Sequence, residues 1–222
     1  MASERDFIKL ASEITECHKC TRLVKWREKI AKEKRAAYAN EIYWGKPIAG
    51  FGDNRAKILV LGLAPGAHGA NRTGRIFTGD RSGDWLFRAM HKAGLASQPE
   101  SVSRQDGLKL TNAWVSTAVK CAPPDNKPTP AERVKCSAFL SRELAMLDQV
   151  KVIVCLGSFS LTSICDELKI RPRPKFGHGV VFSHQKYEIV CSYHPSQQNT
   201  FTGKLTEKMF DSVFAKAVKL AR

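Results

Sequence analysis

Four short apolar runs, each followed by a glycine-rich or polar segment, constrain the fold of this chain most strongly. They are KILVLGL at 57–63, TNAWVSTAV at 111–119, KVIVCLG at 151–157 and YEIVCSY at 187–193. Runs of this length between turn signals are typical of buried strands. Strands that alternate with helices form a parallel sheet covered on both faces. We therefore predict an α/β fold, a three-layer α/β/α sandwich around a mainly parallel four-stranded sheet.

The segments between the runs predict the helices of this sandwich. Helix formers or amphipathic patterns occupy residues 4–16, 22–39, 84–93, 129–147, 158–168 and 205–221. Residues 180–183 are a candidate short strand, and the Gly- and Pro-rich residues 43–56 are interpreted as a loop. At roughly 100–200 residues per domain, the chain is expected to form a single domain over 1–222, which includes an N-terminal helical segment of about 1–40.

The carboxyl ends of the strands are the expected place for a functional site, because ligands bind there in open α/β sheets. The segments that directly follow the strands are 64–80, 120–128, 157–160 and 194–204. They are also the segments with the densest glycine and polar content. Topology and composition therefore indicate the same edge of the sheet.

The charge of the chain narrows the class of partner. Lys and Arg number 36 against 21 Asp and Glu, which gives a formal net charge of +15. Such an excess favours a polyanion, with nucleic acid first and an anionic membrane surface second, and the alternative is a merely soluble basic surface. No apolar run approaches the ~20 residues that span a bilayer, and the start MASERDFIKL has no signal-peptide pattern. We expect an intracellular, cytoplasmic protein with no membrane partner.

The seven cysteines divide into two groups. An odd number in an intracellular chain argues against a disulfide framework. Three of them lie in apolar runs or in a predicted helix and are expected to be small buried hydrophobes: Cys155, Cys165 and Cys191. The other four lie in polar or loop-like surroundings: Cys17, Cys20, Cys121 and Cys136. Four such thiols indicate a Cys₄ site for zinc or for an iron–sulfur cluster, and the spacing does not choose between these metals.

Two long motifs carry a resemblance to a known family. GLAPGAHGANRTGRIFTGD at 62–80 and YHPSQQNTFTGKL at 193–205 resemble the two signature motifs of the uracil-DNA glycosylase superfamily. With its C-x-x-C, distant Cys-x-Pro-Pro and further Cys, the chain is most similar to family 5, the type-b enzymes. The resemblance covers roughly residues 14–220. It implies a monofunctional DNA-repair enzyme that flips out deaminated bases, uracil and also hypoxanthine and other damaged bases, and hydrolyses the N-glycosidic bond.

The resemblance also implies a cofactor and a partner. The cofactor would be a [4Fe–4S] cluster on the four cysteines Cys17, Cys20, Cys121 and Cys136, with a structural role because hydrolysis needs no electron transfer. The partner would be DNA that contains damaged bases, and the enzyme is expected to act as a monomer.

Three residues are expected to carry the chemistry by this resemblance. His194 would donate a hydrogen bond to an oxygen of the departing base, which stabilises the developing anion. Asp80 would position water or stabilise the sugar cation, and its alternative is an N-cap of the following helix. Asn126 would assist catalysis or recognition from the neighbouring loop.

Further residues are expected to bind the base. Phe77 would be the aromatic platform under the extruded base. The loop after the first strand would line the pocket through Gly62, Leu63, Ala64, Gly66 and His68. Ser116 stands where related families have an Asn, and a hydroxyl reads a base edge less strictly, which predicts a broad substrate range.

Contacts to the DNA itself are expected from both motifs. Positive side chains would bind phosphates, namely Arg72, Arg75 and Lys204. The loop after His194 would enter the DNA with polar side chains rather than an apolar wedge: Gln197, Gln198 and Asn199.

Two other function classes compete with this interpretation. One is a non-catalytic nucleic-acid-binding module with a structural Cys₄ metal site, which would have no need of the two long motifs. The other is a metal-dependent nuclease, which the loops disfavour because they lack clustered carboxylates for Mg²⁺.

Overall fold

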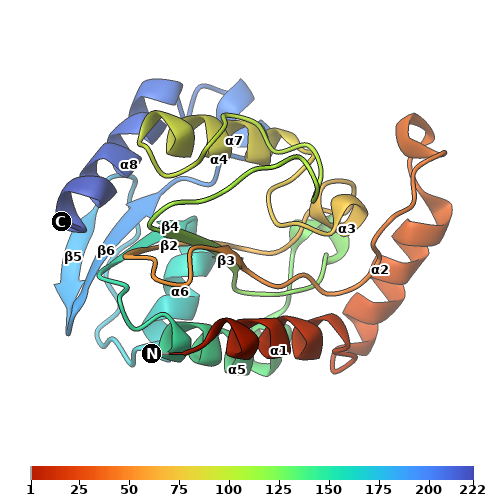
Figure 1. The fold of residues 1–222 in the computed structure, drawn as a ribbon, viewed down its shortest axis with the longest axis horizontal. Coiled ribbons are helices and arrows are strands. Elements are labelled where there is room, and N and C mark those ends of the chain that lie inside the picture. The colour runs from red at the N-terminus through yellow and green to blue at the C-terminus, as the bar shows by residue number, and fades with distance from the viewer. Residues whose placement is uncertain (1) are drawn as a thin grey trace.

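The computed structural model describes residues 2–222, and a mostly parallel sheet is its centre (Figure 1). In the described residues the sheet has six strands in the order β1-β3-β2-β4-β6-β5. The four central strands are mutually parallel: β3 (Ala113–Thr117), β2 (Ile58–Gly62), β4 (Val152–Leu156) and β6 (Tyr187–Ser192). These are the four predicted strands. Their carboxyl ends therefore lie at one edge.

The two outer strands extend the sheet beyond the four expected strands. β1 (Phe51–Gly52) pairs with β3, and β5 (Val181–His184) pairs with β6, both antiparallel. β5 matches the candidate strand at 180–183. β1 lies in the segment interpreted as a loop, because two paired residues are too few to show a strand pattern in a sequence.

Helices cover both faces of the sheet, as expected for three layers (Figure 1). One layer holds α4 (Arg81–Lys92), the short α7 (Gln197–Phe201) and α8 (Glu207–Leu220). The opposite layer holds α1 (Glu4–Thr15), α5 (Pro130–Met146) and α6 (Ser158–Glu167). Successive residues of a strand point to opposite faces of the sheet and so belong to two different hydrophobic cores. Val60 packs towards α4 and α8, whereas Leu59 and Leu61 pack towards α5 and α6. The α/β/α sandwich is confirmed.

The remaining helical elements lie near the carboxyl edge of the sheet. They are α2 (Thr21–Glu33), α3 (Ala70–Thr73) and the short 3₁₀ turns η1 (Ala36–Tyr38) and η2 (Pro124–Asn126). The helix predicted over 22–39 ends early because Lys34 has a φ of 58°. A small third core of Leu10, Ile14, Leu23, Val119 and Phe139 joins α1 and α2 to the body.

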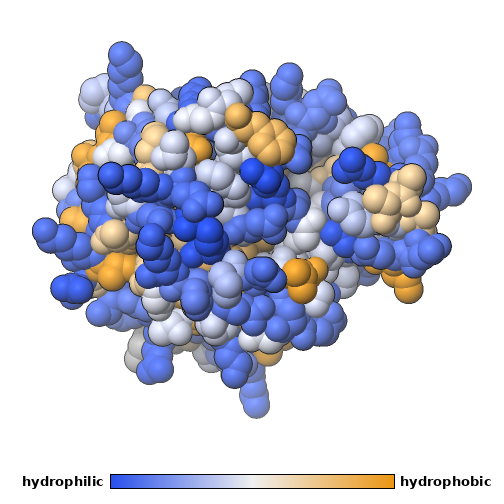
Figure 2. All heavy atoms as spheres, turned by 90° about the horizontal axis from the view of Figure 1, so that it is seen from above, coloured by the Kyte–Doolittle hydropathy of each residue, from blue (hydrophilic) through white to orange (hydrophobic). Residues whose placement is uncertain are grey.

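The surface over α4, α7 and α8 is mostly hydrophilic, with apolar side chains only in small separate patches (Figure 2). Among the described helices, none combines the length and the apolar character that crossing a bilayer requires.

Candidate active site at the carboxyl edge of the sheet

Phe77 and His194 come from the two sequence motifs and meet at the carboxyl edge. Their ring centroids lie 5.9 Å apart with the planes 30° from parallel. Gly62, the last residue of β2, allows this approach, because a Cβ built there would lie 2.6 Å from the Phe77 ring. Gly157, which follows β4, lies beside His194. Loops after three neighbouring strands therefore converge on one point.

Phe77 adopts an unusual backbone conformation for an aromatic residue. Its φ is 54°, in the left-handed region that non-glycine residues rarely occupy. Such a conformation costs on the order of 1–3 kcal/mol and persists only where the surroundings impose it. The ring is 6% exposed and also packs against the core between β2 and α4. The loop therefore holds Phe77 in a fixed orientation at the edge of the core.

Asp80 is placed for both roles considered from the sequence. Its Oδ1 accepts a hydrogen bond from Gly83 N at 3.0 Å and so caps α4. Its Oδ2 lies against the loop after β2, where a Cβ on Gly69 would lie 1.9 Å away and one on Gly66 would lie 2.9 Å away. Burial raises the pKa of Asp80, and the hydrogen bond from Gly83 opposes that rise. The N-cap role is confirmed, and it leaves one carboxylate oxygen facing the loop.

His194 is a neutral imidazole at physiological pH. Burial alone lowers its pKa to about 4. The backbone carbonyl of His194 accepts a hydrogen bond from Asn199 Nδ2 at 2.9 Å, and Ser196 Oγ accepts from Asn199 N at 3.3 Å. The turn into α7 is thereby closed directly behind the histidine. A neutral ring in a fixed position can donate one N–H without transferring a proton.

The loop after β2 continues the sheet by two hydrogen bonds. Ala118 N donates to the carbonyl of Gly62, and Val119 N donates to that of Leu63, both at 3.0 Å. Ala64 packs against the third core, which contains Cys121 and Cys136. The peptide groups expected to face the base are thus connected to the cysteine region.

His68 has a partner that the sequence did not reveal. Its Nδ1 lies 3.0 Å from the hydroxyl of Tyr43, and the two rings meet edge to face. Burial is the largest cause that lowers the pKa of His68, and Arg35 and Arg72 lower it further.

Two arginines predicted to bind phosphate have internal partners instead. Arg72 donates to the carbonyls of His68 at 2.8 Å and Gly79 at 2.9 Å, and it pairs with Glu41 at 2.5 Å. Arg75 is 8% exposed and pairs with Asp106 at 2.5 Å. Both side chains are therefore held by partners within the protein, which leaves them less available for the phosphate contacts predicted from the sequence.

Ser116 also lies away from the expected base pocket. It is 0% exposed, donates to Glu143 Oε2 at 2.7 Å and accepts from Lys120 Nζ at 2.6 Å. Lys120 and Glu143 form a buried ion pair at 2.6 Å between β3 and α5. The hydroxyl is thus part of an interior network. A direct contact from Ser116 to a base edge is contradicted by this placement.

The segment after His194 is exposed, as a loop that approaches DNA would be. Gln197 and Gln198 lie on the surface of α7, and Lys204 lies over the ring of Tyr193 at 4.9 Å. Phe201 is 67% exposed, with Arg81 stacked 4.3 Å from its ring centroid. An exposed aromatic residue therefore accompanies the polar side chains here, one turn beyond the expected tip.

Asn126 lies on the loop between β3 and α5, also at the carboxyl edge. It is exposed and has a φ of 54°. Its catalytic role stays a prediction, since no contact joins it to Phe77 or His194 in the structure.

A pocket between α2, β3 and α5 is lined by the four cysteines Cys17, Cys20, Cys121 and Cys136. The atom-free space of this pocket, part of which is open to solvent, is about 340 Å³. The described side chains contain no preformed group of three or more His, Cys, Asp or Glu at the spacing of a single metal ion. The other three cysteines are fully buried in the core between the sheet and α6, as expected.

Hydrogen-bond donors reach the sulfur atoms of this pocket. Arg27 Nη1 lies 3.1 Å from Cys121 Sγ and also donates to the carbonyl of Cys17. Lys120 N donates to Cys136 Sγ at 3.3 Å. Burial raises the pKa of Cys121 to about 11 and that of Cys136 to about 12. A bound group of positive charge would therefore be needed to stabilise the two side chains as thiolates. The donor set fits a thiolate-bound group.

Comparison with known proteins identifies the family. A sequence model of the Uracil DNA glycosylase superfamily matches residues 49–218. The chain belongs to the uracil-DNA glycosylase superfamily. A "Type-5 uracil-DNA glycosylase" of Mycobacterium tuberculosis is 49% identical over 217 residues, which are 94% of this chain and 79% of that protein. One of Thermus thermophilus is 46% identical over 210 residues, 94% of this chain and 95% of the relative.

A third such relative, from Pyrobaculum aerophilum, is 40% identical over 214 residues, 96% of this chain and 91% of its own length. The resemblance read from the two motifs is thus confirmed. So is the expectation of a uracil-DNA glycosylase enzyme rather than a non-catalytic binding module, at the level of the family.

Several functional contacts of this glycosylase were missed from its sequence. Arg27 was treated as one charge among many on a basic helix, although it follows Cys20 by seven residues and so shares its helix face. Tyr43 lies in the segment interpreted as a loop and Asp106 in a segment with no predicted element, and their partners are 25 and 31 residues away along the chain. No local pattern in the sequence indicates such pairs.

Proposed function

We propose that this protein is a DNA-repair glycosylase that removes uracil from DNA by hydrolysing the N-glycosidic bond and leaves an abasic site. The observation that carries the proposal is the convergence of Phe77, His194 and Asp80 on one edge of the sheet. Each comes from a signature motif, and each fits a separate requirement of the reaction. Curated relatives that share 40–49% identity are named for this activity.

The base would reach these residues only after leaving the helix. An enzyme that acts on a base within a duplex extrudes the nucleotide, at a cost of a few kcal/mol. The exposed α7 segment supports this step, because Gln197, Gln198 and Phe201 can take the space of the extruded base.

Departure of the base requires stabilisation of an anion. As the glycosidic bond breaks, negative charge develops on the base and positive charge on the sugar. The neutral His194 can donate its N–H to a base oxygen, beside the apolar ring of Phe77. The lowered pKa favours the neutral form of His194 near pH 7. The histidine therefore acts as a hydrogen-bond donor and not as a general acid.

The attacking water would be positioned by Asp80. The Oδ1 atom of this residue holds the start of α4, and that bond fixes the direction of Oδ2 towards Gly66 and Gly69. A carboxylate fixed in this way can orient a water molecule and stabilise the sugar cation. The cap and the catalytic function then use different oxygens of one side chain.

Removal of hypoxanthine and other damaged bases, without a covalent intermediate, is part of the proposal. Residues 62–80 contain no lysine, which supports a hydrolytic reaction without a Schiff base. Because Ser116 is buried, it does not explain a broad range of substrates. That range would rest instead on stacking, which accepts any base, and on a single neutral donor.

A [4Fe–4S] cluster held by Cys17, Cys20, Cys121 and Cys136 also belongs to this proposal. The four-thiol lining of the pocket and the donors from Arg27 and Lys120 support it. When bound, such a group would supply no chemistry to hydrolysis and would link α2 to the loop after β3.

The test uses oligonucleotides that each carry one modified base, uracil or hypoxanthine, followed by alkali to cleave abasic sites. We expect strand cleavage only after alkali, and no protein–DNA adduct when borohydride is added during the reaction. A strong borohydride-dependent adduct would contradict the hydrolytic mechanism, and intact strands after alkali would contradict the function.

A further inference from the structure

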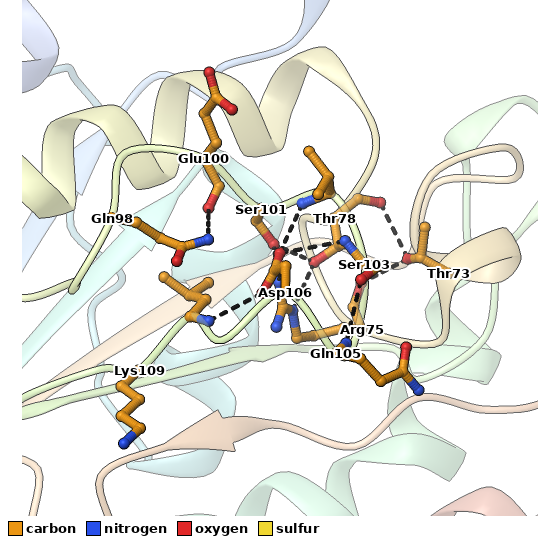
Figure 3. Close-up of polar contacts among 12 residues, drawn as sticks. Thr73, Arg75, Thr78, Gln98, Glu100, Ser101, Ser103, Gln105, Asp106 and Lys109 are labelled. Carbon is orange, nitrogen blue, oxygen red and sulfur yellow. Dashed lines mark hydrogen bonds and ion pairs between the residues drawn. The ribbon is translucent and has the colours of Figure 1, made fainter.

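The segment 98–109 lies against the turn that carries Phe77, although it belongs to neither sequence motif (Figure 3). Gly79 N donates to the carbonyl of Ser101 at 3.0 Å. The hydroxyls of Ser101 and Thr78 lie 2.6 Å apart, and Arg75 Nη2 donates to Ser101 Oγ at 2.6 Å. The two segments are thus joined by backbone and side-chain hydrogen bonds on both sides of Phe77.

Asp106 organises the segment from within. Its Oδ2 accepts from Val102 N at 2.8 Å and from Arg75 Nη2 at 2.5 Å, and its Oδ1 accepts from Leu108 N at 3.0 Å. Although burial acts in the opposite direction, Arg75 and these amides hold the pKa of Asp106 at about 2. The carboxylate is therefore charged at every pH at which the protein is used.

The network is interior. Ser101 is 1% exposed and Thr78 is 0% exposed, so neither side chain can reach DNA. Hydrogen bonds in such surroundings are strong and fix one geometry. Thr73 adds a further bond to the carbonyl of Thr78 at 3.1 Å.

Phe77 stands between two members of this network and has the strained φ of 54°. Arg75 Nε donates to Thr78 Oγ1 at 3.0 Å, so the residues on either side of the turn are tied to each other. A non-glycine residue stays in this conformation only when its neighbours impose it. Arg75 and Ser101 bridge the turn through Thr78, as does Thr73.

We propose that Arg75, Ser101 and Asp106 are positioning residues that hold Phe77 in the orientation that receives the base. The inference rests on the proposed function, in which Phe77 stacks on that base. It assigns to Arg75 a role in the chemical step, through Phe77, in place of the phosphate contact expected from the sequence.

The test is a double-mutant cycle between Arg75→Met and Phe77→Ala, measured as the single-turnover rate of uracil release at saturating enzyme. Arg75→Met is expected to reduce the rate by about 10–100-fold in the normal background, since a misplaced group costs factors of this size. In the Phe77→Ala background it is expected to reduce the rate by less than about threefold. DNA affinity should stay within about twofold, and Arg75→Lys should recover part of the rate because it keeps the ion pair.

Arg88→Met is the matched control, because Arg88 forms a similar ion pair with Asp211 at 2.6 Å between α4 and α8. It should leave the rate unchanged. If Arg75→Met does not fold, Ser101→Ala takes its place in the same cycle. Equal rate losses in both Phe77 backgrounds would overturn the positioning role while leaving the proposed function intact. An unchanged rate for Phe77→Ala would overturn both the platform and the residues proposed to position it.

Discussion

At the scale of single residues, Asp80 and His194 lie at one edge of the sheet, and we propose that they act on different groups. His194→Ala is expected to slow uracil release more than hypoxanthine release, because a protonated purine depends less on a donor to its oxygen. Asp80→Ala should slow both by similar factors, since every substrate needs the same water and passes through the same sugar cation. One catalytic group contributes about 10²–10⁴-fold. Single-turnover cleavage of both substrates by both variants measures these effects.

The N-cap bond of Asp80 requires a control for folding. Thr129 caps α5 in the same way and accepts from Glu132 N at 3.2 Å. Thr129→Ala should cost about 1 kcal/mol of stability, as loss of a cap does, without changing the rate. Near-normal rates for a folded Asp80→Ala would mean that Asp80 serves only as a cap.

His194 also predicts a pH dependence of stability. Its pKa is about 4 in the folded protein against an ordinary value of 6.5, so between these values only the unfolded chain binds the proton. The free energy of unfolding should therefore fall as pH falls from 6.5 to 4, by about 2 kcal/mol at pH 5. His194→Gln should remove this contribution. Urea denaturation of both proteins at pH 7.5 and 5 tests it, and parallel losses would show that His194 titrates normally.

At the scale of elements, the four cysteines line one pocket between α2, the segment after β3, and α5, and the proposed cluster would connect these elements. Replacing Cys121 by Ala is expected to abolish absorption near 400 nm and to reduce stability, because binding of a metal group contributes to folding free energy. Cys155→Ala is the matched control, since Cys155 is equally buried but lies in the core beside α6. The absorption of Cys155→Ala should be unchanged. The reverse pattern would show that the ligands are assigned to the wrong cysteines.

The elements themselves were largely predictable from the sequence. Buried parallel strands form continuous apolar runs, and strong caps such as Thr129 with Pro130 mark helix starts, so the central strands and long helices lie where expected. The edge strand β1 was not predictable from the sequence. It has only two residues, and they form a strand because the fold places them beside β3. α7 was missed for a similar reason, since five residues, four of them polar, are too few to show a helical period.

The site was predictable in its location but not in its charge pairing. The motifs identify Phe77, Asp80 and His194, and the fold brings them to one edge. The internal contacts of Arg72, Arg75 and Ser116 were not predictable, because the carboxylates that they contact lie 27–31 residues away along the chain. A sequence shows that an arginine is present, and only the fold shows that a carboxylate already neutralises it.

At the scale of the whole molecule, the net charge of +15 predicts how the protein binds DNA. Phosphate contacts release counterions, so the logarithm of the association constant should fall linearly with the logarithm of salt concentration and depend little on sequence. Arg72 and Arg75 have internal partners, so we expect other, exposed basic side chains, including Lys204, to supply most of this slope. Lys204→Ala should reduce the slope by about one unit. Titration of labelled DNA at several salt concentrations measures it, and a flat response would contradict the phosphate contacts.

The central claim is that this edge of the sheet hydrolyses the bond between a base and its sugar. The most direct measurement is the amount of free uracil released from a duplex that carries one deoxyuridine, set against the state of the DNA strand. The account predicts one free base per abasic site, an unbroken strand until alkali is added, and loss of release in Asp80→Ala without loss of DNA binding. Release of uracil as a nucleoside or nucleotide, or no release from the unaltered protein, would contradict it.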